Sequence, residues 1–150
     1  MKNILILTII LVTFSLSSKA QNLIGSTEIT ITDSMKNQDS FNSGVKNDDN
    51  GSLILTYLNF MHKDGSPKID DNFILMSSQF EIKNNKCIAE IYLYKDDLFD
   101  KFTTTFNSDT AKYKSLGNNE WYYKKGKLSI NITRIPEQRC FMIQYKLFNK

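Results

Sequence analysis

The sequence predicts an α+β domain in which an antiparallel β-meander sheet packs against one short helix. Two segments, about 74–94 and 128–146, alternate apolar and polar residues on either side of turn-forming residues, as hairpins do. Between them, apolar side chains recur at helical spacing, at Leu98, Phe99, Phe102 and Phe106. An all-β architecture is the alternative, because residues 103–105 are threonines, whose β-branched side chains are stiff in helices.

The first 20 residues predict a cleavable secretory signal peptide. Lys2 precedes an uncharged, mainly apolar run from Ile4 to Leu16, which is too short to span the roughly 30 Å hydrocarbon core of a membrane. Small residues three and one positions before Gln21 match the spacing that signal peptidase requires. We therefore expect one exported domain, residues 21–150, that is periplasmic or extracellular and spans no membrane after cleavage. An uncleaved N-terminal anchor is the alternative.

The N-terminal part of this domain predicts two strands separated by a long loop. Alternating Ile and Thr in residues 27–32 indicate a half-buried strand, and the turn-forming residues of 34–52 indicate the loop. The apolar run 52–60 indicates a buried strand that ends before the Asp64-Gly65 turn. A helix that starts at Ser66-Pro67 and includes Ile69, Phe73 and Met76 competes with the first arm of the next hairpin.

Matching apolar faces support the first hairpin. Asn84-Asn85 suits a two-residue turn, because Asn tolerates the positive φ that such turns require. With this turn, apolar side chains meet on one face, as a paired register requires. The predicted pairs are Ile82–Cys87, Phe80–Ala89, Ser78–Ile91 and Met76–Leu93.

The second hairpin is centred on residues 135–138, where Pro136 suits the second position of a turn. The predicted apolar pairs are Ile132–Phe141, Ile130–Ile143 and Leu128–Tyr145. A further strand is expected to begin at residues 120–124, and Asp96 or Asp97 is expected to cap the helix.

Charge is unevenly distributed along the chain. The formal net charge is +3, and removal of Lys2 and Lys19 with the signal peptide leaves +1, which makes nucleic acid a poor partner. Residues 111–150 carry nine basic and two acidic side chains, so residues 21–110 carry a net charge of −6. This asymmetry indicates either a binding surface or interleaved strands whose charges neutralise one another.

Residues 120–127 combine aromatic and basic side chains, which suit contact with an acidic protein or an acidic polysaccharide. The residues predicted to bind such a ligand are Trp121, Tyr122, Lys124, Lys125 and Lys127. In an alternating strand, however, Trp121 and Tyr123 share one face, so half of these aromatic residues are expected in the core.

Few residues suit catalysis or metal binding. His62 is the only histidine, and a catalytic triad or metal site needs several converging groups. The HExxH, GxSxG and phosphate-loop motifs are absent from the sequence. Residues 48–51 resemble half of an EF-hand, but Lys46 takes the first ligand position and Tyr57 the twelfth. We therefore predict no catalytic residue, no metal site and no cofactor.

Cys87 and Cys140 are the only cysteines, and an even number in an exported chain suggests a disulfide. The hairpin registers oppose it, because Cys87 lies on a core face and Cys140 pairs with Thr133 on a polar face. Both the disulfide and two free thiols remain open at this point.

Two tripeptides resemble the acceptor sequence of a periplasmic O-glycosylation system of some Gram-negative bacteria. They contain Ser34 and Thr110, each preceded by Asp and each expected in a loop that a modifying enzyme reaches. These two hydroxyl groups are therefore predicted glycosylation sites.

The sequence favours a small exported, non-enzymatic binding or interaction protein, of the inhibitor or immunity type, that uses its basic and aromatic C-terminal part. A small periplasmic hydrolase working with paired carboxylates is one alternative, with Asp70-Asp71 or Asp96-Asp97 as candidate pairs. A structural envelope component is the other.

Overall fold

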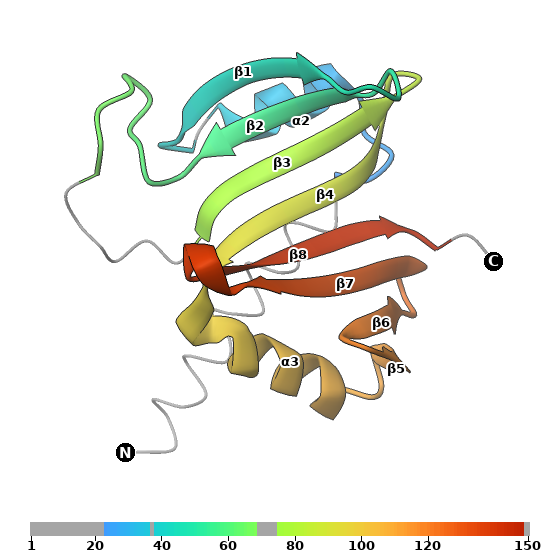
Figure 1. The fold of residues 1–150 in the computed structure, drawn as a ribbon. Helices are drawn as coiled ribbons and strands as arrows, with labels where there is room; N and C mark the ends of the chain where they lie inside the picture. The colour runs from blue at the N-terminus through green and yellow to red at the C-terminus, as the bar shows by residue number, and fades with distance from the viewer. Residues whose placement is uncertain (1–22, 37, 69–74, 149–150) are drawn as a thin grey trace, which may run out of the picture.

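A computed structural model of the chain describes residues 23–36, 38–68 and 75–148. Within these ranges, eight strands form one antiparallel sheet against which α-helices pack (Figure 1). This arrangement confirms the predicted α+β class. The predicted signal peptide of residues 1–20 lies outside the described residues, as do residues 69–73 of the alternative helix.

The elements have the following bounds. The strands are β1 (Phe41–Asn47), β2 (Leu53–Leu58), β3 (Leu75–Lys83), β4 (Lys86–Lys95), β5 (Tyr113–Gly117), β6 (Glu120–Tyr123), β7 (Leu128–Ile135) and β8 (Cys140–Leu147). The helices are α2 (Glu28–Met35) and α3 (Phe99–Ser108), with short 3₁₀ helices η1 (Asp96–Leu98) and η2 (Pro136–Gln138). The strands lie in the order β1-β2-β3-β4-β8-β7-β6-β5.

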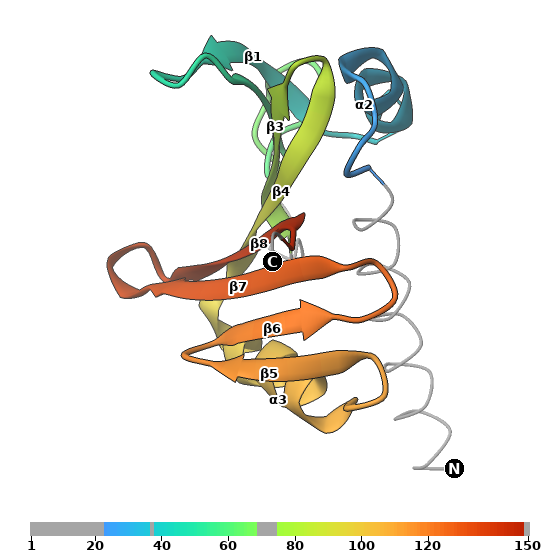
Figure 2. The ribbon, with the colours of Figure 1, turned by 90° about the vertical axis from the view of Figure 1, so that its right-hand side faces the viewer.

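The same arrangement occurs twice in this fold. Helix α2 precedes the meander β1–β4, and helix α3 precedes the meander β5–β8. Strand β4, the last strand of the first half, pairs with β8, the last strand of the second half. Figure 2 shows the two halves on either side of this pair. The strands of the acidic and basic parts of the sequence are therefore separated rather than interleaved, although η1 and α3, from the acidic part, pack against the basic half. No repeat is visible in the sequence itself.

The first predicted hairpin is present, with a register that changes at a bulge. Strands β3 and β4 join at Asn84-Asn85, both of which have positive φ, at 52° and 59°. The predicted pair Ile82–Cys87 is confirmed. Beyond it the bulge shifts the register by one residue, so that Phe80 pairs with Glu90. The predicted partners of residues 78 and 80 are therefore wrong by one residue. Met76 lies in a second register shift, and its predicted partner Leu93 pairs with Ser77 instead.

The second predicted hairpin has the expected faces but different partners. Ile132 pairs with Ile143 rather than with Phe141. The connection holds four residues, 136–139, and ends at Arg139 with a φ of 51°. A shift of two residues preserves the face of every side chain, because side chains alternate with a period of two.

Residues 27–32, predicted as a strand, belong instead to the start of helix α2. The Thr27 hydroxyl accepts a hydrogen bond from a backbone N–H three residues on and so caps the helix. Ile31 and Met35, four residues apart, face the core with 0% and 4% exposure, whereas Ile29 is 74% exposed. The alternation of Ile and Thr resembles a strand, but the buried residues follow the helical period.

Two strands were not predicted, β1 within the expected loop and β5. Both lie at an edge of the sheet and expose every residue after the first. Gly44 and Gly117, at positive φ, interrupt their patterns. An edge strand needs no buried face of its own, so its sequence lacks the alternation by which central strands are recognised.

The predicted helix is confirmed as η1 and α3, and the segments 52–60 and 120–124 are confirmed as β2 and β6. The Thr105 hydroxyl donates to the Lys101 carbonyl (2.8 Å), which is how a threonine satisfies its hydroxyl within a helix. Asp96 was predicted as a candidate helix cap, but its side chain caps neither helix. It binds Arg134 of β7 through both carboxylate oxygens (2.6 and 2.7 Å).

The core lies on the face of the sheet that the helices cover. Six paired residues, each 0–2% exposed, cross six strands in one row: Leu55, Phe80, Glu90, Tyr145, Ile130 and Trp121. Phe102 and Phe106 of α3 pack on this face, with ring centroids 5.5 Å from Phe141 and 5.4 Å from Trp121 respectively. The opposite face of the sheet is called the outer face below.

The two cysteines are buried and unpaired. Cys87 lies at the start of β4, and Cys140 pairs with Lys95 at the end of the same strand. Eight residues of strand separate Cys87 from Lys95, or about 26 Å at about 3.3 Å per residue. A disulfide requires Cα atoms about 6 Å apart, so of the two possibilities left open by the sequence, this fold has the two free thiols.

We expect two free thiols in the purified chain. After unfolding in guanidinium without reductant, both should be alkylated by iodoacetamide, and added reductant should not increase the labelling seen by mass spectrometry. In the folded chain Cys87 should react slowly, because burial raises the pKa of its thiol to about 12. Labelling that appears only after reduction would contradict this expectation.

Candidate functional site

Strand β6 divides the predicted ligand-binding residues between two faces. Trp121 is 2% exposed, its indole N–H donates to Asn107 Oδ1 of α3 (2.9 Å), and its ring packs on Phe106. Trp121 therefore belongs to the core, as alternation along the strand allowed. Tyr122 lies half-buried on the outer face, with its ring centroid 4.7 Å from that of Phe148.

The register of the C-terminal half aligns basic residues with Tyr122 on the outer face. Across β5, β6, β7 and β8, the paired residues are Lys114, Tyr122, Ser129 and Lys146, called the basic row below. Paired residues point to the same side of a sheet. Because neighbouring strands lie about 4.8 Å apart, the row extends over about 14 Å.

The β6–β7 turn adds three exposed lysines to this region: Lys124, Lys125 and Lys127, called the turn lysines below. The Lys124 ammonium donates to the Thr110 carbonyl oxygen (2.6 Å). Between them, Gly126 packs so closely that a Cβ atom would lie 2.7 Å from the Tyr123 ring. The turn therefore has a defined conformation that holds its lysines beside the basic row.

Two carboxylates lie near these lysines. Glu120 lies on the same face as the basic row, two residues from Tyr122, and accepts a hydrogen bond from the Ser129 hydroxyl (3.1 Å). Asp109 lies in the turn after α3, where Lys112 and then Lys124 lower the pKa of its carboxyl. Five lysines, two in the row and three in the turn, thus outnumber these two carboxylates. The potential at this surface is positive.

An apolar strip continues the outer face toward the joint of the two halves. It consists of Ile91, Leu93 and Met142, all half-buried, with Leu93 paired to Met142 across β4 and β8. Ile91 lies on the same face as Lys146, two residues along β4 from Ala89, which pairs with Lys146. The outer face therefore combines an apolar centre with a basic flank.

Glu90 is a carboxyl group in the core, and no sequence signal identified it. It is 0% exposed, Oε1 accepts from the Leu23 N–H (3.0 Å), and Oε2 accepts from the Tyr92 hydroxyl (3.0 Å). Burial raises the pKa of this carboxyl to about 7, although both hydrogen bonds favour the charged form. The predicted register placed Ala89 on the core face, and the bulge puts Glu90 there instead.

Other predicted site residues lie on the surface. Ser34 is exposed within helix α2 rather than in a loop, and Thr110 is exposed in the turn after α3, as expected. Their glycosylation stays a prediction.

The His62 Nδ1 lies 2.8 Å from Asp39 Oδ2, and this hydrogen bond lowers the pKa of Asp39. Asp48, from the EF-hand-like segment, accepts the Ser52 N–H within its own turn (2.6 Å).

Among the residues that the structure describes, no helix is long and apolar enough to cross a membrane, and no three His, Cys, Asp or Glu side chains converge as metal ligands. Comparison with known proteins found no matching family model, no matching curated protein and no matching solved structure.

Glu90 should make stability depend on pH near neutrality. Its pKa is about 7 in the folded chain against an ordinary value of 4.5, so the folded state holds the proton more tightly. The stabilisation is present below about pH 4.5 and is lost as the pH rises to about 7, by on the order of 3 kcal/mol.

Urea unfolding from pH 4.5 to 8 should therefore show Glu90→Gln gaining stability relative to the wild type as the pH rises. Glu81→Gln, a half-buried carboxylate of β3, is the matched control and should show a smaller difference. Parallel pH profiles for the wild type and Glu90→Gln would contradict the assignment.

Proposed function

We propose that the chain is an exported, non-enzymatic binding protein that holds an acidic protein on the outer face of β5–β8. The observation that carries this proposal is the basic row, in which strand pairing aligns Lys114, Tyr122 and Lys146 on one face, with Ser129 between the last two. Strand pairing fixes the backbone positions of these residues, so binding a partner restricts side-chain freedom but requires no ordering of the backbone.

The separation of charge between the two halves supports an electrostatic role. Strands β5–β8 all lie in the basic part of the sequence, and they touch the acidic part of the sheet only through the β4–β8 pair. A surface of one sign attracts a partner of opposite sign and accelerates its association. The positive charge of this half favours a partner with an acidic surface.

The apolar strip favours a protein over an acidic polysaccharide as the partner. Protein interfaces commonly have an apolar centre and a polar or charged rim. Leu93 and Met142 would contribute to such a centre, and the basic row and the turn lysines to its rim. A charged polysaccharide would use the lysines but has little need of the apolar strip.

The alternative of a carboxylate-dependent hydrolase has one point in its favour, the raised pKa of Glu90. Such an enzyme also needs a second carboxylate close by and access for its substrate. Glu90 is fully buried, and its hydrogen-bond partners are the Tyr92 hydroxyl and the Leu23 backbone. Its surroundings therefore suit a core residue better than a catalytic acid.

Charge reversal tests the proposal. The triple variant Lys124→Glu, Lys125→Glu, Lys127→Glu should weaken capture of the partner by about tenfold or more, since each exposed pair contributes up to about 1 kcal/mol. The chain, purified after export from cells that express the full sequence, is immobilised and exposed to envelope and medium fractions of its host. Bound material is identified by mass spectrometry and by sugar analysis at two salt concentrations.

A matched control carries the same change of charge on the other half of the sheet, at the exposed residues Lys46, Lys83 and Lys86. It should retain an acidic protein, and binding by the wild type should weaken as salt increases. Equal loss in both triple variants would contradict the proposal, as would capture of a polysaccharide alone.

A further inference from the structure

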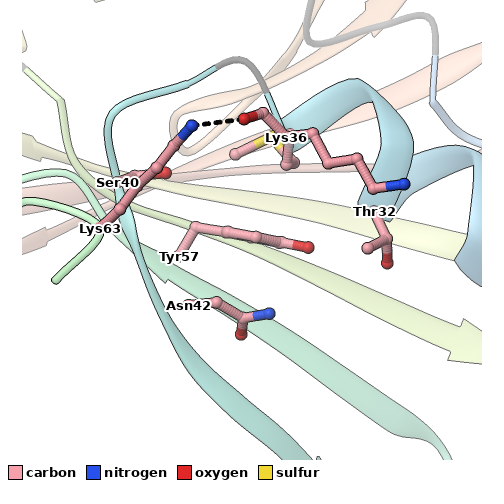
Figure 3. Close-up of a pocket in the computed structure, with 7 residues that line it drawn as sticks. Thr32, Lys36, Ser40, Asn42, Tyr57 and Lys63 are labelled. Carbon is pink, nitrogen blue, oxygen red and sulfur yellow. Dashed lines mark hydrogen bonds between the residues drawn. The ribbon is translucent and has the colours of Figure 1, made fainter. Parts of the chain in front are cut away.

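A pocket of about 270 Å³ lies between helix α2 and strands β1 and β2, in the half of the sheet that lacks the basic row. Its lining includes Met35 and Lys36 from the end of α2, Ser40 and Asn42 from the entry to β1, Tyr57 from β2 and Lys63 from the turn after β2. Figure 3 shows these side chains around one space, with the Tyr57 hydroxyl directed toward Thr32.

Two buried hydroxyl groups in this pocket have no hydrogen-bond partner within the described part of the chain. They are the Tyr57 hydroxyl and the Ser40 Oγ, on residues that are 4% and 5% exposed. Buried polar groups are nearly always paired, and leaving one unpaired costs stability. Ordered water or a ligand in the pocket would satisfy both hydroxyl groups.

The lining is rich in donors and carries positive charge. The Lys63 ammonium donates to the Lys36 carbonyl oxygen (2.5 Å) at the end of α2, which fixes it beside the pocket (Figure 3). Lys36 contributes a second ammonium, which pairs with Asp33 outside the lining. None of the described residues in the lining carries a carboxylate. A ligand group that accepts hydrogen bonds and carries negative charge fits this chemistry.

We infer that this pocket binds a small organic carboxylate. The Tyr57 and Ser40 hydroxyls would donate to its oxygens, and the two ammonium groups would balance its charge. Met35 and the Tyr57 ring form an apolar wall for the organic part, which an inorganic anion would not use. The pocket volume of about 270 Å³ is slightly below the range typical of drug-sized ligands, which suits a small organic anion.

The unpaired hydroxyl of Tyr57 gives a signature that separates binding from a structural role. Removing an unpaired buried polar group relieves its cost, so Tyr57→Phe should be at least as stable as the wild type without ligand. The same substitution should weaken ligand binding. If the hydroxyl instead supported the fold, Tyr57→Phe would be less stable than the wild type without ligand.

The test uses benzoate as the probe and benzyl alcohol as its uncharged counterpart of similar size. In amide NMR titrations of the purified chain, benzoate should shift the signals of Met35, Asn42 and Tyr57, and benzyl alcohol should not. Tyr57→Phe and Ser40→Ala should each lower the benzoate affinity by about threefold or more. Lys63→Met, which keeps both hydroxyls, should lower it as well.

Tyr122→Phe, which removes a tyrosine hydroxyl from the outer face, is the matched control and should bind benzoate unchanged. The reversed turn-lysine variant should do the same, so this test is independent of the basic row. Shifts of equal size with benzyl alcohol, tighter binding of inorganic phosphate, or no shift with benzoate would overturn the inference. A clear loss of thermal stability in Tyr57→Phe would also overturn it.

Discussion

The pairing of β4 with β8 is the interaction on which the rest of the structure depends. It is the one strand pairing that joins the two halves of the described sheet, and it comprises seven residue pairs. Beneath it, the rings of Tyr92 and Tyr145 meet edge to face with centroids 6.0 Å apart, so the core continues from one half into the other. Each half alone would present its last strand as an open edge.

A bulge near the start of β4 determines which side chains face that core. It leaves Ile88 outside the pairing with β3, so Glu90 rather than Ala89 joins the buried row. A carboxyl group is tolerated there because the Leu23 N–H and the Tyr92 hydroxyl both donate to it. The same contact holds the segment before α2 against the centre of the sheet, so one irregularity in a strand also positions the first helix.

The elements that could be predicted from sequence are those with an apolar pattern of their own, such as the helix containing Phe102 and Phe106. The class of fold and the faces of the second hairpin follow from such patterns. In the first hairpin the predicted core face of β4 is wrong beyond the bulge, where Ile91 and Leu93 lie on the outer face. Register depends on the bulge and on a four-residue connection, neither of which alternation reveals. The alignment of Lys114 with Lys146 and the burial of Glu90 could therefore not be predicted. The cluster of lysines around Lys124 could be read directly from the sequence, because its members are close together in the chain.

The two halves repeat one arrangement with different side chains, and this difference accounts for the pocket. Helix α3 presents phenylalanines to the sheet, and Phe106 fills its half against Tyr113 and Trp121. Helix α2 buries only Ile31 and Met35, which occupy less volume than aromatic rings. Because protein interiors are otherwise densely packed, the shorter side chains leave space beside α2. The half with aromatic packing has a filled core and a charged outer face, whereas the other half keeps an internal space lined by polar groups.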